Sequence, residues 1–129
     1  MALSVVRLGS PRHSGEGLRI GTVRRPPRGV PRSAFASRDF YDVWLPELAP
    51  SEALLKLGQS ADDDKTWRLF ARRYVAEMKA AEKQHLLDLL AVLSHQTNVA
   101  IGCYCADESR CHRSLLRKLL ATAGADIAG

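Results

Sequence analysis

The chain has 129 residues, of which 46% are hydrophobic and 26% charged, so it is expected to form one globular domain over residues 1–129. No apolar run is long enough to span a bilayer, and the N-terminus lacks the apolar core of a signal peptide. All three cysteines lie within residues 103–111, which does not fit a secreted disulfide framework and favours the reducing cytoplasm.

The net charge of +5 is unevenly distributed along the chain. Residues 1–38 contain eight arginines and one acid, Glu16, whereas residues 39–129 contain 11 basic and 13 acidic residues. A basic N-terminal part favours an anionic partner such as a phosphate, a nucleotide or a nucleic acid. The nucleic-acid signal is weak because no aromatic residues alternate with the basic ones. A solvated basic surface is the simpler interpretation.

Two short strands are expected over residues 3–8 and 18–23, and the connection between them permits a hairpin without requiring one. An arginine loop, residues 24–32, follows the second strand and contains four arginines and three prolines. The prolines exclude a regular helix or ladder, so the loop is stiff. Ligands often bind at strand ends in α/β folds, and guanidinium groups suit carboxylates and phosphates. We therefore expect Arg24 and Arg28 to bind an anion, unless the loop is merely a solvated surface.

The rest of the chain is predicted to form four helices and one further strand. Helices are expected over residues 51–57, 60–79, 82–94 and 110–123, and a buried strand over residues 99–104. Residues 40–48 are expected to form a loop or a short helix. Ser51, Ser60 and Ser109 are the expected helix starts. The pattern predicts an α/β domain with a mostly parallel sheet of about three to four strands covered by helices.

Two of these helices are expected to pack through apolar faces. Trp67, Phe70 and Tyr74 recur at helical spacing, which is typical of a core-facing stripe. The helix over residues 82–94 is apolar over a wide face and is expected to be well buried.

The turn between the last strand and the last helix concentrates the reactive side chains. Strand alternation places Cys103 and Cys105 on one face. Cys111 is expected in the first helical turn, where the helix dipole and nearby cationic groups lower a thiol pKa. Cys111 and His112 are therefore the candidate catalytic residues. Arg113 and Ser114 follow them as candidate ligand-binding groups.

Several functions fit these residues. The first is nucleophilic thiol chemistry or redox sensing; the segment from Cys105 to Arg110 is similar to the Cys-to-Arg loop of rhodaneses but lacks its glycine. The second is zinc binding by Cys103, Cys105, Cys111 and His112, although neighbouring residues on a helix project about 100° apart, which disfavours joint ligation. The third is anion binding without covalent chemistry. Buried cysteines that serve only packing are the remaining interpretation.

Four segments in order carry a family resemblance: Arg24 to Val30, which ends in Pro-Arg-Gly-Val, Trp44 to Ser51, the Trp67-Phe70-Tyr74-Glu77 spacing, and Cys111-His112-Arg113 after an apolar strand. The chain resembles the domain-of-unknown-function 488 (DUF488) family, the YeaO-like proteins. The resemblance implies a small bacterial α/β protein, usually cytosolic, and implies no reaction. Members often carry an acid at the position of Cys105, so Cys105 departs from the family pattern.

The leading hypothesis is a pocket at the strand ends for a small phosphate- or nucleotide-like anion. Arg24, Arg28, Arg113 and Ser114 would hold the ligand beside Cys111 and His112. The alternative is a non-catalytic module that binds zinc or nucleic acid. The leading hypothesis requires the arginine loop to face the Cys111-His112-Arg113 turn.

Overall fold

A four-stranded parallel sheet is the framework of the computed structural model, which describes residues 1–128. Its order is β1-β4-β2-β3, with β1 at Leu3–Arg7, β4 at Val99–Cys103, β2 at Leu18–Gly21 and β3 at Val43–Trp44. All five residues of β4 are buried because this strand pairs with β1 on one side and β2 on the other. The expected α/β class and parallel sheet are confirmed.

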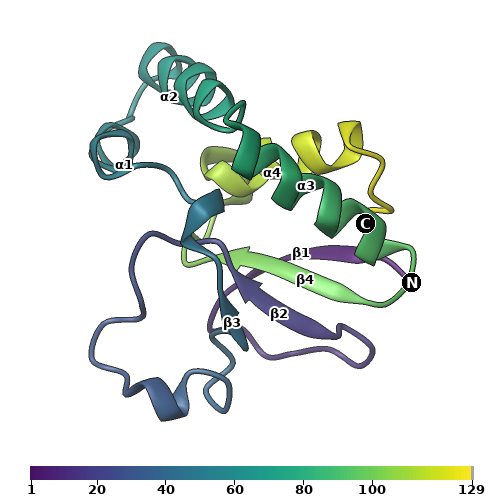
Figure 1. Cartoon of the computed structure of the whole chain (residues 1–129). Coiled ribbons are helices and arrows are strands. Elements are labelled where there is room, and N and C mark those ends of the chain that lie inside the picture. The colour runs from purple at the N-terminus through teal and green to yellow at the C-terminus, as the bar shows by residue number, and fades with distance from the viewer. Residues whose placement is uncertain (129) are drawn as a thin grey trace.

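Four helices gather on one side of the sheet, and the long segment between β2 and β3 loops out on the other side (Figure 1). The helices are α1 at Glu52–Gln59, α2 at Asp64–Glu77, α3 at Ala81–Ser94 and α4 at His112–Thr122. Short 3-10 turns occur at Arg32–Ala34, Pro46–Leu48 and Glu108–Arg110. The main core lies between sheet and helices and includes Phe70 and Tyr74, as the apolar stripe predicted.

The N-terminal strands do not form a hairpin. Strand β4 lies between β1 and β2, and both pairings are parallel, so the two N-terminal strands are neighbours only through it. Strand β3 was not predicted from the sequence. It pairs with β2 where a loop or short helix was expected. A two-residue strand has too little periodicity to be recognised from sequence.

Two helix starts differ from the prediction, while Ser51 caps α1 as expected by accepting a hydrogen bond from the Leu54 amide. Helix α2 begins after Asp63, not Ser60, because the Asp63 carboxylate accepts from the Thr66 amide at 2.7 Å. Ser109 does not cap the last helix. It lies in the 3-10 turn capped by Asp107, and α4 starts one residue after Cys111.

Helix α3 is less buried than its composition suggested. Leu89 is 54% exposed and Val92 61% exposed, although Leu87 and Leu90 lie in the core.

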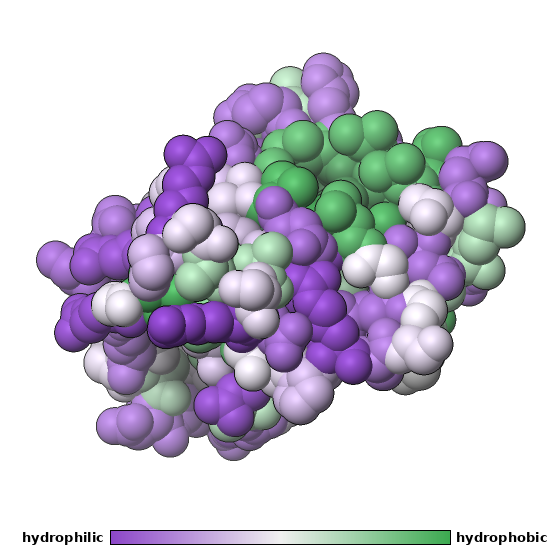
Figure 2. Space-filling model, turned by 90° about the horizontal axis from the view of Figure 1, so that it is seen from below, coloured by the Kyte–Doolittle hydropathy of each residue, from purple (hydrophilic) through white to green (hydrophobic). Residues whose placement is uncertain are grey.

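Seen from below, the surface is mostly hydrophilic but carries one continuous hydrophobic area (Figure 2). Among the described residues, no helix has the length and apolar character needed to cross a membrane.

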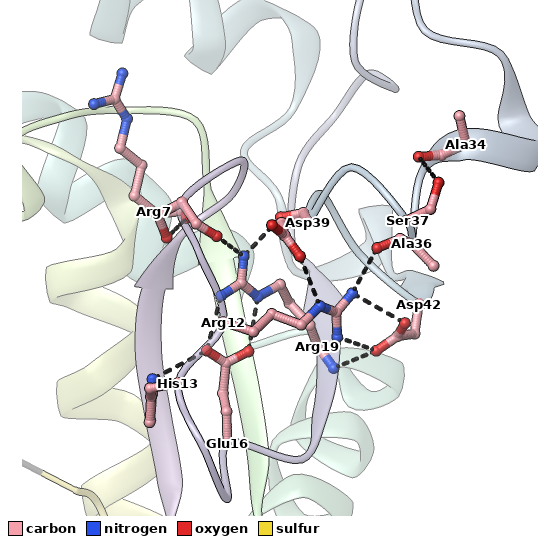
Figure 3. A network of polar contacts seen from close by, with 11 residues as sticks. Arg7, Arg12, His13, Glu16, Arg19, Ala34, Ala36, Ser37, Asp39 and Asp42 are labelled. Atoms are coloured by element: carbon pink, nitrogen blue, oxygen red, sulfur yellow. Dashed lines mark hydrogen bonds and ion pairs between the residues drawn. The ribbon is translucent and has the colours of Figure 1, made fainter.

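A buried ion pair fixes the loops on the face of the sheet opposite the helices. Arg19 is fully buried and donates to both carboxylate oxygens of Glu16 at 2.8 Å (Figure 3). The remaining Arg19 nitrogen donates to the carbonyls of Ser10 and Asp39. Burial acts to raise the pKa of Glu16, but the hydrogen bond and charge of Arg19 lower it on balance. The ion pair therefore ties the segment after β1 to the segment before β3.

We expect Glu16→Gln to lower the free energy of unfolding by ~3–5 kcal/mol, because Arg19 would keep a buried charge without its carboxylate. Urea denaturation measures the change. The double variant Glu16→Gln/Arg19→Met removes both charges. Its loss of unfolding free energy should therefore be clearly smaller than the sum of the losses of the two single variants. Simple additivity of the two losses would contradict a coupled ion pair.

Candidate functional site

A pocket of about 360 Å³ lies at the carboxyl ends of β2 and β4. It brings the start of the arginine loop to the cysteine turn, so these two segments face each other as the leading hypothesis required. The lining residues come from four parts of the chain: Val23, Arg24, Arg25, Pro50, Leu55, Gly58, Gln59, Trp67, Phe70, Cys103, Tyr104, Cys105, Arg110, Cys111 and His112. The hydroxyl of Tyr104 also donates to the Arg25 carbonyl at 2.8 Å, which links the two segments directly.

Cys111 occupies the N-cap position of α4, with extended backbone angles of φ −128° and ψ 152°. It is 3% exposed and lines the pocket. No acidic residue lies in the first turn of α4 and no side chain caps its amides. A thiolate at this position would therefore lie at the positive end of the helix without competition from a capping side chain.

His112 is held in one orientation by the strand beside it. Its Nε2 lies 2.6 Å from the carbonyl oxygen of Thr22, and the ring packs on Tyr74 with centroids 5.6 Å apart. Because a carbonyl only accepts, Nε2 carries the proton and Nδ1 keeps its lone pair in the neutral ring. The Nδ1 atom lies 3.7 Å from Cys111 Sγ, so it can accept the proton of the Cys111 thiol.

The three cysteines form one cluster. The Sγ atoms of Cys103 and Cys105 are 3.7 Å apart, in line with the shared face predicted for them, and all three thiols are free. Hydrogen bonds from Cys103 and Cys105 hold the pKa of Cys111 well below its usual value, burial opposes this, and His112 lowers the pKa further. Hydrogen bonding to Cys105 and Cys111, together with burial, raises the pKa of Cys103. Of the three thiols, Cys111 is therefore the one whose surroundings most favour deprotonation.

Three arginines line the pocket. Arg24 is anchored by its Nε to the Pro50 carbonyl and by its Nη2 to the carbonyls of Pro46 and Ala49, bonds that leave its Nη1 uninvolved. Arg25 and Arg110 lie at the rim, where each is paired with an exposed carboxylate, Glu52 and Asp64 respectively. These surface pairs are weak and can be exchanged for another anion.

The other predicted ligand-binding residues lie elsewhere. Arg113 is buried, and its two terminal nitrogens donate to the carbonyls of Val6 and Cys105. Ser114 donates its hydroxyl to the Cys111 carbonyl. Arg28 is exposed and does not line the pocket. The structure therefore brings Arg24, Cys111 and His112 together but gives Arg113 and Ser114 backbone partners.

The helical spacing of Trp67 and Phe70 predicted a core-facing stripe. Both rings also line the pocket, and they stack with centroids 5.2 Å apart. The guanidinium of Arg110 lies 5.9 Å from the centre of the Trp67 ring. Helical spacing shows that such residues share a face, but it does not show that one end of the face borders a cavity.

A family model described as "Active DUF488-N3 subclade" matches residues 3–124. No curated protein and no solved structure gives a significant match.

The surroundings of Cys111 predict that alkylation of its thiol follows a lower pKa than that of an ordinary cysteine. In the metal-free, reduced protein, iodoacetamide should modify Cys111 with an apparent pKa below the ~8.5 of a free thiol, because the thiolate is stabilised. Mass spectrometry resolves Cys111 from the exposed Cys105. His112→Gln keeps a donor for Thr22 but loses Nδ1, so the pKa of Cys111 should rise; His85→Gln on α3 is the matched control. An ordinary or raised pKa at Cys111 in the unaltered protein would refute the thiolate.

Proposed function

The chain belongs to the DUF488 family, and we propose that it binds a small phosphate- or nucleotide-like anion in this pocket and presents Cys111 to it as a nucleophile. The observation that carries the proposal is the position of Cys111, which sits at the N-terminus of α4 in a pocket whose rim holds Arg25 and Arg110. The description of the matched subclade as active agrees with a reactive centre.

The lining of the pocket favours a ligand with two parts. Arg24, Arg25 and Arg110 provide cationic donors for a phosphate or carboxylate. Trp67 and Tyr104 provide apolar and aromatic surface for the rest of the molecule. A nucleotide or another phosphorylated aromatic compound combines both features, and a volume of about 360 Å³ is enough for such a ligand.

The chemistry proposed for Cys111 is nucleophilic displacement. His112 Nδ1 takes the thiol proton, and the Cys111 sulfur donates its electron pair to an electrophilic atom of the ligand. A sulfur bond forms to that atom while the bond to the leaving group breaks. The leaving group keeps the bonding electrons and receives the proton from His112. Water then releases the bound group from sulfur and regenerates the thiol.

Binding of a nucleoside monophosphate tests the cationic rim. Arg25→Ala and Arg110→Ala should each weaken binding by roughly tenfold, the loss of one charge-assisted hydrogen bond. Arg28→Ala removes an exposed arginine outside the pocket and is the matched control. Isothermal titration with the nucleotide and with inorganic phosphate measures the change.

Three outcomes decide this prediction. Weakened binding in both rim variants but not in Arg28→Ala supports the pocket. Equal affinities in all four proteins would overturn it. Binding to oligonucleotides alone, with a steep salt dependence, would instead indicate a nucleic-acid-binding module.

A further inference from the structure

We propose that Cys103, Cys105, Cys111 and His112 bind one Zn²⁺ ion, and that the bound ion masks the sulfur of Cys111. The metal site stands on its own geometry. Only the masking rests on the proposed function, since it concerns the reactivity of Cys111.

The donor atoms of three of the four residues are already close enough together to share an ion. The Sγ atoms of Cys103 and Cys105 are 3.7 Å apart, and Cys111 Sγ lies 3.7 Å from His112 Nδ1. The donor atoms of Cys103, Cys111 and His112 all lie within 4.8 Å of one another. Zinc bonds of about 2.3 Å to sulfur and 2.0–2.1 Å to nitrogen set tetrahedral edges of about 3.8 Å and 3.6 Å. Cys103, Cys111 and His112 therefore need only small shifts to bind an ion, and the exposed Cys105, which lies outside this group, must move towards them to complete the four ligands.

The backbone at the start of α4 removes the sequence-based objection to joint ligation by neighbouring residues. That objection treated Cys111 and His112 as two helical residues. Cys111 is in fact extended, and the helix begins at His112. The two side chains therefore converge instead of projecting about 100° apart, as they would on a helix.

His112 has the orientation of a metal ligand. Its Nε2 proton is engaged by the Thr22 carbonyl at 2.6 Å, which leaves Nδ1 as the free donor facing the sulfurs. Histidines that bind metals commonly donate their other ring N–H to a carbonyl or carboxylate, which fixes the ring and strengthens the ligand. Thr22 lies at the end of β2, so the strand provides this support.

Arg113 supplies the charge that such a site needs. Three thiolates and a neutral imidazole around Zn²⁺ carry a net charge of −1. Arg113 is 3% exposed, its terminal nitrogens bond to the carbonyls of Val6 and Cys105, and its buried Nε has no partner. Over residues 1–128 it makes no ion pair with a carboxylate. A buried cation without a carboxylate is best compensated by a negatively charged sulfur cluster beside it.

The donor set and its access favour zinc. Thiolate and imidazole ligands select zinc or copper(I) over magnesium and calcium. Cys103, Cys111 and His112 are buried, whereas Cys105 is exposed and borders the pocket. An ion can therefore enter through the pocket, bind Cys105 first and then be enclosed by the other three ligands.

The test is titration of the reduced, metal-free protein with Co²⁺ and then Zn²⁺. We expect thiolate-to-cobalt charge-transfer absorption that saturates at one ion per chain and disappears when Zn²⁺ displaces Co²⁺. Cys105→Ser changes an exposed residue, so it should fold normally. It should weaken Zn²⁺ binding by more than the roughly 10- to 100-fold typical of losing an outer-shell partner. His85→Gln is the matched control and should bind as the unaltered protein does.

Alkylation of Cys111 with and without one equivalent of Zn²⁺ completes the experiment. Protection of Cys111 by Zn²⁺ supports both parts of the proposal. Absence of one-to-one metal binding would overturn the site, while leaving the anion titrations and the metal-free alkylation profile unaffected. Metal binding without protection would overturn the masking. Metal binding to a protein whose metal-free Cys111 has an ordinary pKa would overturn the proposed nucleophile and leave the zinc site intact.

Discussion

The parallel pairing of β4 with both β1 and β2 brings together the segments that line the pocket. It places the carboxyl ends of β2 and β4 at one edge of the sheet, so the segments after them must meet. One segment carries Thr22 and Arg24, and the other carries the cysteines and the start of α4. The 2.6 Å contact between His112 and the Thr22 carbonyl joins these ends directly. Without that pairing, the thiols and the arginine loop would have no common pocket.

Two buried arginines show how charge is distributed through the fold. Arg19 is paired with a carboxylate, Glu16, and its role is to hold two loops against the sheet. Arg113 is equally buried but bonds only to backbone carbonyls, beside a cluster of three sulfurs. The first charge is compensated within its own ion pair. The second has no carboxylate partner among residues 1–128, and its closest polar neighbours are the backbone carbonyls of Val6 and Cys105.

Much of the fold could be predicted from periodicity and composition. The continuous apolar run before Cys103 gave the central strand, and the spacing of Phe70 and Tyr74 gave a core-facing helix. Two helix starts were predicted at the wrong residue, because nearby polar side chains compete for the free backbone amides. Asp63 caps α2 in place of Ser60 because its carboxylate reaches the free Thr66 amide. Asp107 caps a 3-10 turn that contains Ser109, so α4 begins only at His112. The exposure of Leu89 and Val92 also escaped prediction, since it depends on how far neighbouring elements extend over α3.

The sequence by itself determined the chemistry available to this protein. Three cysteines, a histidine and two arginines between residues 103 and 113 define a cluster that can hold a thiolate or a soft metal ion. Only the tertiary structure decided which arginine side chains line the pocket. Arg113 follows His112 in sequence, yet it is withdrawn from the pocket because the Val6 carbonyl, 107 positions away, accepts its hydrogen bond. Arg24 and Arg25 reach the cysteine turn because strand order, which depends on long-range pairing, brings β2 beside β4.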